Sequence, residues 1–130
     1  MTTDLWMLLA AVGLYWVQIL SAAVPNIVIK GVPWAIGPRD QDGKETPPWA
    51  HRLKRASDNM QENLVVFGAV VLVVHAAGAA NDTSALGTMV FLGARVAHPV
   101  LYVVGIPGLR TAAWTVGVIG TAMAAWPLFG

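Results

Sequence analysis

Four polar residues recur on one side of the segment that follows residue 48. Arg52, Arg55, Asn59 and Glu62 are separated by three, four and three positions. If this segment is helical, that spacing places all four on one stripe of its surface. The stripe would supply two cations, an amide and a carboxylate to a single cleft, and such groups bind ions through charge-assisted hydrogen bonds.

A second polar stripe lies further along the chain. Arg95, His98 and Tyr102 are separated by three and four positions. Arg95 lies about halfway along an otherwise apolar segment, where a charge in a membrane costs at least a few kcal/mol unless it is partnered. Residues of this kind usually face the interior of a helix bundle or a polar cavity. Because Arg110 follows in the next connection, we expect both stripes and Arg110 to form one cleft at the same end of the molecule.

The composition defines the elements that must carry these residues. Of 130 residues, 56% are hydrophobic and 12% are charged, against about 25% charged in an ordinary soluble domain. This many apolar residues cannot be enclosed in one small soluble core. Four bilayer-spanning helices of about 20 residues would use about 80 positions. A soluble enzyme and a disordered chain are therefore excluded, and a net charge of +1 argues against nucleic-acid binding.

The hydrophobic pattern predicts an all-α integral membrane protein with four spans in a single domain. The expected spans are residues 5–29, 49–80, 84–105 and 111–129, with a loop at residues 30–48. Pro25 should bend the first span or end its regular hydrogen bonding. The second helix would be about 48 Å long at 1.5 Å per residue, which exceeds the ~30 Å hydrocarbon core. Its charged start should therefore project from the bilayer.

The distribution of basic residues predicts the orientation in the membrane. Six Lys and Arg residues lie between the start of the loop and residue 55, and Arg110 lies between the third and fourth spans. The connection between the second and third spans has none. Since connections rich in Lys and Arg stay in the cytoplasm, both termini are expected outside it. Size and composition favour the bacterial cytoplasmic (inner) membrane.

Simpler structural explanations exist for the same residues. Arg52, Lys54 and Arg55 could act only as topology signals at the lipid headgroups. Glu62 could hold helices together with Asn59, or form an ion pair with Arg95. The glycines and alanines of the fourth span predict close helix packing rather than a site. No metal site is expected, because the three histidines are widely separated and the chain has no cysteine.

Three segments of the chain together match one known pattern. Residues 47–62 contain Arg-Ala, then an asparagine and an acid three positions later. Residues 94–102 contain Arg95, His98 and Tyr102, and residues 108–111 read Gly-Leu-Arg-Thr. These segments resemble the second-span signature, the third-helix motif and the third-to-fourth connection of the MAPEG family, the membrane-associated proteins in eicosanoid and glutathione metabolism. The resemblance covers nearly the whole chain, including its length, spans and topology.

The resemblance implies a MAPEG-like homotrimer in which glutathione lies between neighbouring subunits in a cleft open to the cytoplasm. Arg110 would be the catalytic residue near the sulfur, because a nearby cation lowers the pKa of a thiol and the thiolate is the nucleophile. The implied activity is a glutathione-dependent membrane transferase or peroxidase that acts on lipophilic electrophiles from the bilayer. The implied glutathione-binding residues are Arg55, Asn59, Glu62, His98, Tyr102 and Thr111, with Arg52 and Arg95 in support.

Two positions differ from the pattern of glutathione-using members. His51 stands where an acid is usual, and Asp58 stands where an arginine is usual before the asparagine. Asp58 would place an anion in a site for an anionic ligand, and we expect Lys54 or Arg55 to hold it. This favours an alternative, a non-catalytic protein of the same fold that binds another small anion or a lipid headgroup. A small drug exporter is a third alternative. Such a protein would need a carboxylate deep in the first span, and residues 5–29 contain none.

Overall fold

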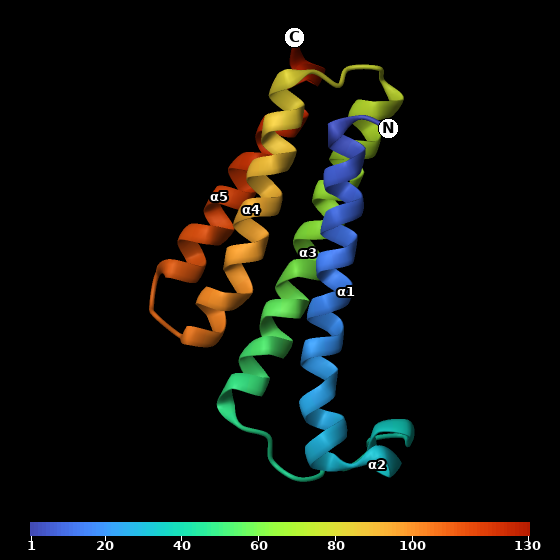
Figure 1. The fold of residues 1–130 in the computed structure, drawn as a ribbon, viewed down its shortest axis with the longest axis vertical. Helices are drawn as coiled ribbons and strands as arrows, with labels where there is room; N and C mark the ends of the chain where they lie inside the picture. The colour runs from blue at the N-terminus through green and yellow to red at the C-terminus, as the bar shows by residue number, and fades with distance from the viewer.

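Four long helices form the molecule, as a computed structural model describes it for all 130 residues (Figure 1). They are α1 (Thr3–Lys30), α3 (Pro48–Ala76), α4 (Asp82–Val104) and α5 (Leu109–Ala125), with a short helix α2 (Val32–Ile36) and a terminal 3₁₀ turn (Trp126–Phe129). Each long helix, the last with its 3₁₀ turn, is long and apolar enough to cross a membrane. The predicted all-α, four-span architecture is confirmed.

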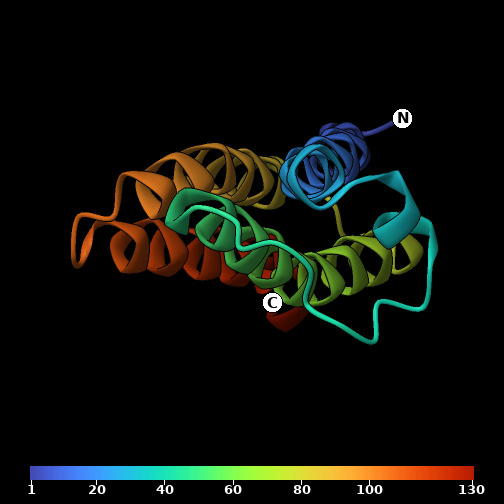
Figure 2. The ribbon, with the colours of Figure 1, turned by 90° about the horizontal axis from the view of Figure 1, so that it is seen from below.

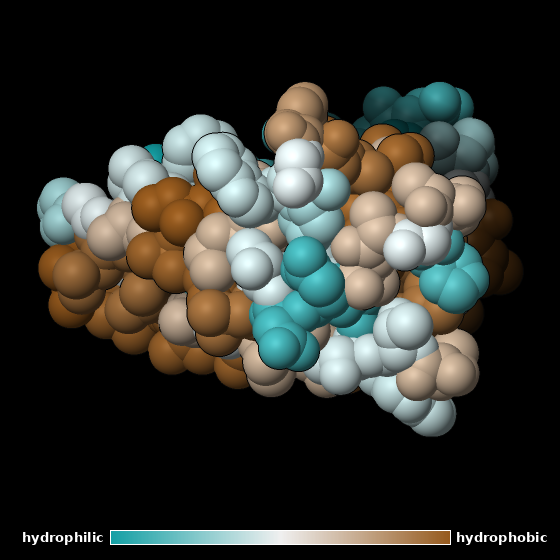
Figure 3. All heavy atoms as spheres, turned by 90° about the horizontal axis from the view of Figure 1, so that it is seen from above, coloured by the Kyte–Doolittle hydropathy of each residue, from teal (hydrophilic) through white to brown (hydrophobic).

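The two ends of the bundle differ in charge. The α1–α3 and α4–α5 connections lie at one end, and both termini lie with the α3–α4 connection at the other (Figure 1). Every Lys and Arg except Arg95 belongs to the first end, in these connections or in the adjoining helix ends; we call it the basic end. Figure 2 looks onto it and shows the α2–α3 connection running beside the first turns of α3. Figure 3 shows the opposite end, where hydrophilic residues gather in the middle and hydrophobic ones flank them.

Local turn chemistry moves some helix boundaries away from the predicted ones. α1 continues through Pro25 to Lys30, so the proline does not end the helix. α3 ends at Ala76, four residues before the predicted end, because Gly78 takes a left-handed conformation with φ of 65°. The predicted loop at residues 30–48 contains α2, in which Pro33 occupies the first turn, a position that proline favours.

α4 and α5 approach each other through glycine. A Cβ atom added at Gly87 would lie 2.5 Å from the backbone nitrogen of Ala124, and one at Gly120 would lie 2.6 Å from the backbone nitrogen of Phe91. No side chain fits in that space, so the two backbones touch, as small residues permit in membrane helix pairs. The close packing predicted for the fourth span is thus present, and it fixes α5 to the outer side of α4.

A hydrophobic cluster ties the remaining helices together. It combines Ala11 of α1, Phe91 of α4 and three α3 residues, Met60, Phe67 and Val71. The rings of Phe67 and Phe91 stack with centroids 3.8 Å apart. This contact holds α3 against α4, so that the polar stripes of the two helices meet at the basic end.

Candidate functional site

Three arginines converge on one cavity at the basic end, which we call the arginine pocket. Its volume is about 310 Å³, at the lower end of the range for small-molecule sites, ~300–1,000 Å³. α3, the end of α4, the connecting turn and the start of α5 each contribute to its walls. The lining residues are Arg52, Arg55, Tyr102, Gly105, Ile106, Pro107 and Arg110.

Arg52 fastens the end of α4 to α3. Its Nη1 donates a hydrogen bond to the carbonyl oxygen of Val103 at 3.0 Å, within the last turn of α4. A guanidinium is favourable there, because the carbonyl groups at a helix C-terminus carry partial negative charge. Gly105 ends α4 with φ of 78°, and a Cβ atom on it would lie 3.0 Å from Arg52 Nη1. Glycine is therefore required both by the backbone conformation and by the approach of the arginine.

Arg110 and Tyr102 form the opposite wall. The guanidinium carbon of Arg110 lies 4.6 Å from the centre of the Tyr102 ring, a cation–π distance that orients the guanidinium plane without neutralising it. Arg110 is exposed, so it keeps its hydrogen-bond donors for a ligand. Tyr102 is half-buried and presents a phenol to the same pocket.

Behind Tyr102, a row of side chains leads from the pocket to the middle of α4. His98 meets Tyr102 edge to face, with ring centroids 5.7 Å apart. Arg95 Nη2 lies 3.5 Å from His98 Nδ1. A guanidinium has no acceptor, so Arg95 donates and Nδ1 accepts, which leaves the proton of a neutral imidazole on Nε2. The third-helix stripe is thus one connected row, with Tyr102 at the pocket and Arg95 at its buried end.

Comparison with known proteins identifies the kind of molecule that carries this site. Residues 3–130 match the MAPEG family. The chain belongs to that family. No curated protein and no solved structure matches it. Its membership makes this chain a multi-pass membrane protein of the glutathione and eicosanoid metabolism family, as the three sequence motifs indicated.

The MAPEG residues predicted for the site fall into separate groups. Arg52, Arg55, Tyr102 and Arg110 line the arginine pocket, whereas Arg95 and His98 lie buried behind it. The side chain of Asn59 is half-buried and accepts a hydrogen bond from Asn63 Nδ2 at 3.3 Å. Two predicted residues are exposed outside the pocket of a single protomer, namely Glu62 and Thr111.

The alternative of an Arg95–Glu62 ion pair is wrong. The molecule contains one ion pair, between Lys54 and Asp58. Arg95 is 1% exposed, and its Nε and Nη1 atoms have no hydrogen-bond partner. Burial inside the protomer means that Arg95 is covered by its own bundle, while Glu62 faces outward from α3.

The two departures from the MAPEG pattern lie away from the arginine pocket. Asp58 Oδ1 pairs with Lys54 Nζ at 2.5 Å, so the expectation that Lys54 or Arg55 holds it is confirmed, with Lys54 as the partner. His51 bonds Thr46 Oγ1 through Nε2 at 3.2 Å. Neither side chain lines the arginine pocket.

The sequence predicts a turn at residues 105–108, but the interpretation did not assign this turn to the site. Gly105, Ile106 and Pro107 form the wall between α4 and α5. Their Gly-Ile-Pro-Gly pattern predicts a turn, and the signal for a site was its position directly before Arg110. Arg52 also has a structural task, the hydrogen bond to Val103, that no spacing rule reveals.

Proposed function

We propose that this protein is a glutathione-dependent membrane transferase, and that the arginine pocket holds the tripeptide. The observation that carries the proposal is the convergence of Arg52, Arg55 and Arg110 with the Tyr102 phenol on one cavity. Glutathione has two carboxylates and is net anionic at neutral pH. Guanidinium groups bind carboxylates through short, paired hydrogen bonds, so the charge and the donors of the pocket suit this ligand.

Arg110 is the residue that we assign to catalysis. Its positive charge favours the thiolate over the thiol, and the thiolate is the nucleophile. The thiolate sulfur attacks the electrophilic carbon, a C–S bond forms, and the leaving group departs with its electron pair. The thiol proton passes to solvent, while Arg110 remains protonated throughout.

The position of the pocket suits a lipophilic second substrate. Ile106 lines the pocket and is 48% exposed, and Leu109 beside it is 42% exposed. Apolar side chains that reach from a polar cavity to the surface of a membrane helix give a bilayer-dissolved electrophile a route to the sulfur. We propose that the basic end faces the cytoplasm, in keeping with the positive-inside rule.

We further propose a homotrimer in which a neighbouring subunit covers the outer face of α3. Glu62 is exposed there, at the edge of the apolar part of a spanning helix, and a carboxylate in that position is costly against lipid. A partner chain would shelter Glu62 and close the side of the cleft. Native mass spectrometry in detergent should give three times the mass of one chain. A stable monomer that retains full activity would rule out a site between subunits.

The direct test is titration calorimetry with glutathione, paired with a conjugation assay that uses a chromogenic aryl halide. Arg110→Ala should reduce the conjugation rate by about a hundred-fold and change glutathione affinity by no more than a few-fold. Arg39→Ala is the matched control, because Arg39 is an exposed cation at the same end outside the arginine pocket. Unchanged turnover in Arg110→Ala would remove this residue from the mechanism.

One observation favours a second candidate function, a non-catalytic protein that binds another small anion. The arginine pocket has no carboxylate among its lining residues, so the α-ammonium group of glutathione finds no counter-charge within one protomer. Inorganic phosphate and succinate should each be titrated beside glutathione. Binding of either with no glutathione binding and no conjugation would favour this second function.

A further inference from the structure

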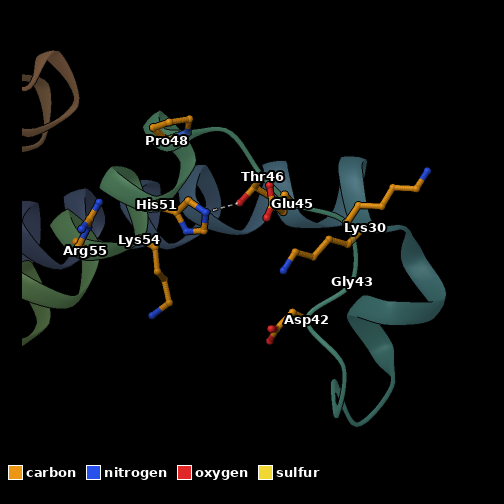
Figure 4. A pocket seen from close by; sticks show the side chains of 10 residues that line it. Lys30, Asp42, Gly43, Glu45, Thr46, Pro48, His51, Lys54 and Arg55 are labelled. Atoms are coloured by element: carbon orange, nitrogen blue, oxygen red, sulfur yellow. Dashed lines mark hydrogen bonds between the residues drawn. The ribbon is translucent and has the colours of Figure 1, made fainter.

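A larger polar cavity lies on another side of α3, where the α1–α3 connection passes the first turns of the helix (Figure 4). Its volume is about 790 Å³, and no hydrophobic residue lines it. We call it the loop cavity. Its lining residues are Lys30, Asp42, Gly43, Lys44, Glu45, Thr46, Pro48, His51, Lys54 and Arg55.

The loop cavity has a surplus of positive charge. Four cations and one imidazole line it, against two carboxylates, Asp42 and Glu45. Only Lys54 among these cations forms an ion pair, and its partner Asp58 lies outside the cavity. The charges of Lys30, Lys44 and Arg55 therefore have no carboxylate at ion-pair distance. An anion is the ligand that this arrangement favours.

The wall formed by the connection is held in place by specific contacts. Thr46 is buried, and its Oγ1 lies 3.2 Å from His51 Nε2 on α3 (Figure 4). Trp34 Nε1 donates to the carbonyl oxygen of Gln41 at 2.7 Å. The ammonium group of Lys30 lies 4.4 Å from the centre of the Trp34 ring. These contacts attach the connection to α1, α2 and α3, so the cavity is built by the fold.

A second cavity adjoins the loop cavity at Lys54, which lines both. We call it the seam cavity, since α1 and α3 supply most of its walls; its volume is about 310 Å³. Its polar side includes Ser57, Asp58 and Gln61 of α3. Its apolar side is formed by α1, through Tyr15, Ile19, Ala22, Ala23 and Ile27. The apolar wall reaches from the basic end to the middle of a membrane-spanning helix.

We propose that these two cavities form a binding site for an anionic phospholipid, with the phosphate in the loop cavity and the start of an acyl chain in the seam cavity. The cations attract the phosphate diester, and Asp42 and Glu45 accept hydrogen bonds from a headgroup that carries hydroxyl groups. Phosphatidylglycerol has this chemistry. His51 lines the loop cavity and Asp58 lines the seam cavity, so both departures from the MAPEG pattern belong to this site. Arg55 lines both the loop cavity and the arginine pocket, but the proposal does not rest on the function proposed for the arginine pocket.

The test is native mass spectrometry of the full chain in detergent, titrated with phosphatidylglycerol or with phosphatidylcholine of the same acyl chains. Wild type should bind phosphatidylglycerol about ten-fold more tightly. A double variant, Lys30→Ala with Lys44→Ala, should lose most of this preference, because each basic residue near a membrane surface contributes measurably to the attraction of anionic lipid. Arg110→Ala is compared with the single variant Lys44→Ala, since each removes one positive charge and Arg110 lies at the same end but outside both cavities. Arg110→Ala should keep the preference, whereas Lys44→Ala should lose part of it.

Several outcomes would overturn the assignment. Equal affinity for the two lipids, or an unchanged preference in the double variant, would exclude the loop cavity as the headgroup site. An equal loss in Arg110→Ala would mean that the lipid responds only to the overall charge of the basic end. Glycerol phosphate, titrated in parallel, separates a free anion from a lipid, and affinity equal to that of phosphatidylglycerol would remove the acyl-chain part of the proposal. A thermal-shift measurement in detergent on the double variant, expected to match wild type, shows that the protein is folded.

Discussion

The helix pair α4 and α5 has two regions that are built on opposite principles. Near the start of α4, Gly87 and Gly120 bring the two backbones into contact, and no charged side chain is among the nearest atoms. At the other end of the same pair, the connecting turn lies open and Arg110 faces a cavity that also contains Arg52 and Arg55. One region is complete within the protomer, whereas the other presents cations that still have room for a ligand.

One region stabilises the helix pair, and the other is available to bind a ligand. Close backbone contact stabilises a helix pair in a membrane through dispersion, because the hydrophobic effect contributes little to helix association in lipid. Several like charges around one cavity repel each other and favour an open, solvated site until an anion binds. The rigid contact at Gly87 therefore holds in place a pair of helices whose far end is electrostatically unfavourable by itself.

The largest effect is expected from breaking the glycine contact. Gly87→Ala places a methyl group 2.5 Å from the backbone nitrogen of Ala124, so α5 must move away along its length. Overpacking of a filled interior typically costs about 1–3 kcal/mol. The steric clash is hard to relieve here, because the contacting atoms belong to the backbone. A thermal-shift assay in detergent should report a melting temperature about 10 °C lower than that of wild type.

The same helix provides the control. Gly93 on α4 has no atom within 4 Å of an added Cβ, so Gly93→Ala should leave the melting temperature equal to that of wild type or raise it slightly through better helix propensity. If both variants melt at the wild-type temperature, the backbone contact does not determine stability. If Gly93→Ala alone is destabilising, that face of α4 is a subunit contact.

A medium effect is expected at the arginine pocket, where Arg52 and Arg55 should respond differently. Arg52→Ala removes the hydrogen bond to the Val103 carbonyl, and bonds that involve a charged group contribute about 1.5–3 kcal/mol. Both the melting temperature and glutathione affinity should fall. Arg55 is exposed, and its side chain forms no hydrogen bond to the protein, so Arg55→Ala should lower affinity alone. Thermal shift and calorimetry on both variants separate the two tasks.

If the two variants lose stability equally, the α4 cap is not the reason that Arg52 is needed. If Arg52→Ala is less stable yet binds glutathione as tightly as wild type, Arg52 positions α4 without contacting the ligand. Arg52→Lys sharpens the result, because a lysine keeps the charge but lacks the planar fork of the guanidinium.

Much of the fold follows from the sequence. Long apolar runs fix the number of spans, and the clustered cations fix which connections share an end. Helix ends were less predictable, since they depend on single backbone conformations. Gly78 ends α3 early through its left-handed φ, and Pro25 is accommodated within α1. The short helix α2 depends on Trp34, whose contacts with Lys30 and Arg39 join residues that no simple periodicity links.

The site was predictable only in part, for a reason that Glu62 illustrates. Helical spacing places Glu62 on the stripe of Arg52 and Arg55, but a stripe 11 residues long covers more of α3 than one cavity. The near end meets the α4–α5 turn and becomes a pocket, while the far end remains outside it in the single protomer. Spacing identifies a face of a helix, and only the neighbouring helices decide which part of that face becomes a site.

The smallest effect is expected at Asp58, and it tests whether the arginine pocket is electrostatically separate from the other face of α3. Asp58 pairs with Lys54 and lines the seam cavity, not the arginine pocket. Both partners are more than half exposed, and exposed pairs of this kind contribute about 0.3–0.5 kcal/mol to stability. Asp58→Arg should therefore change glutathione affinity by less than about three-fold, since charges that do not share a cavity are screened by water and salt.

Calorimetry at two salt concentrations, with Asp58→Asn as the uncharged control, measures this directly. Tightening by about ten-fold at low salt, weakened at high salt, would mean that Asp58 reaches the ligand in the assembled protein, and the arginine pocket would then extend across α3.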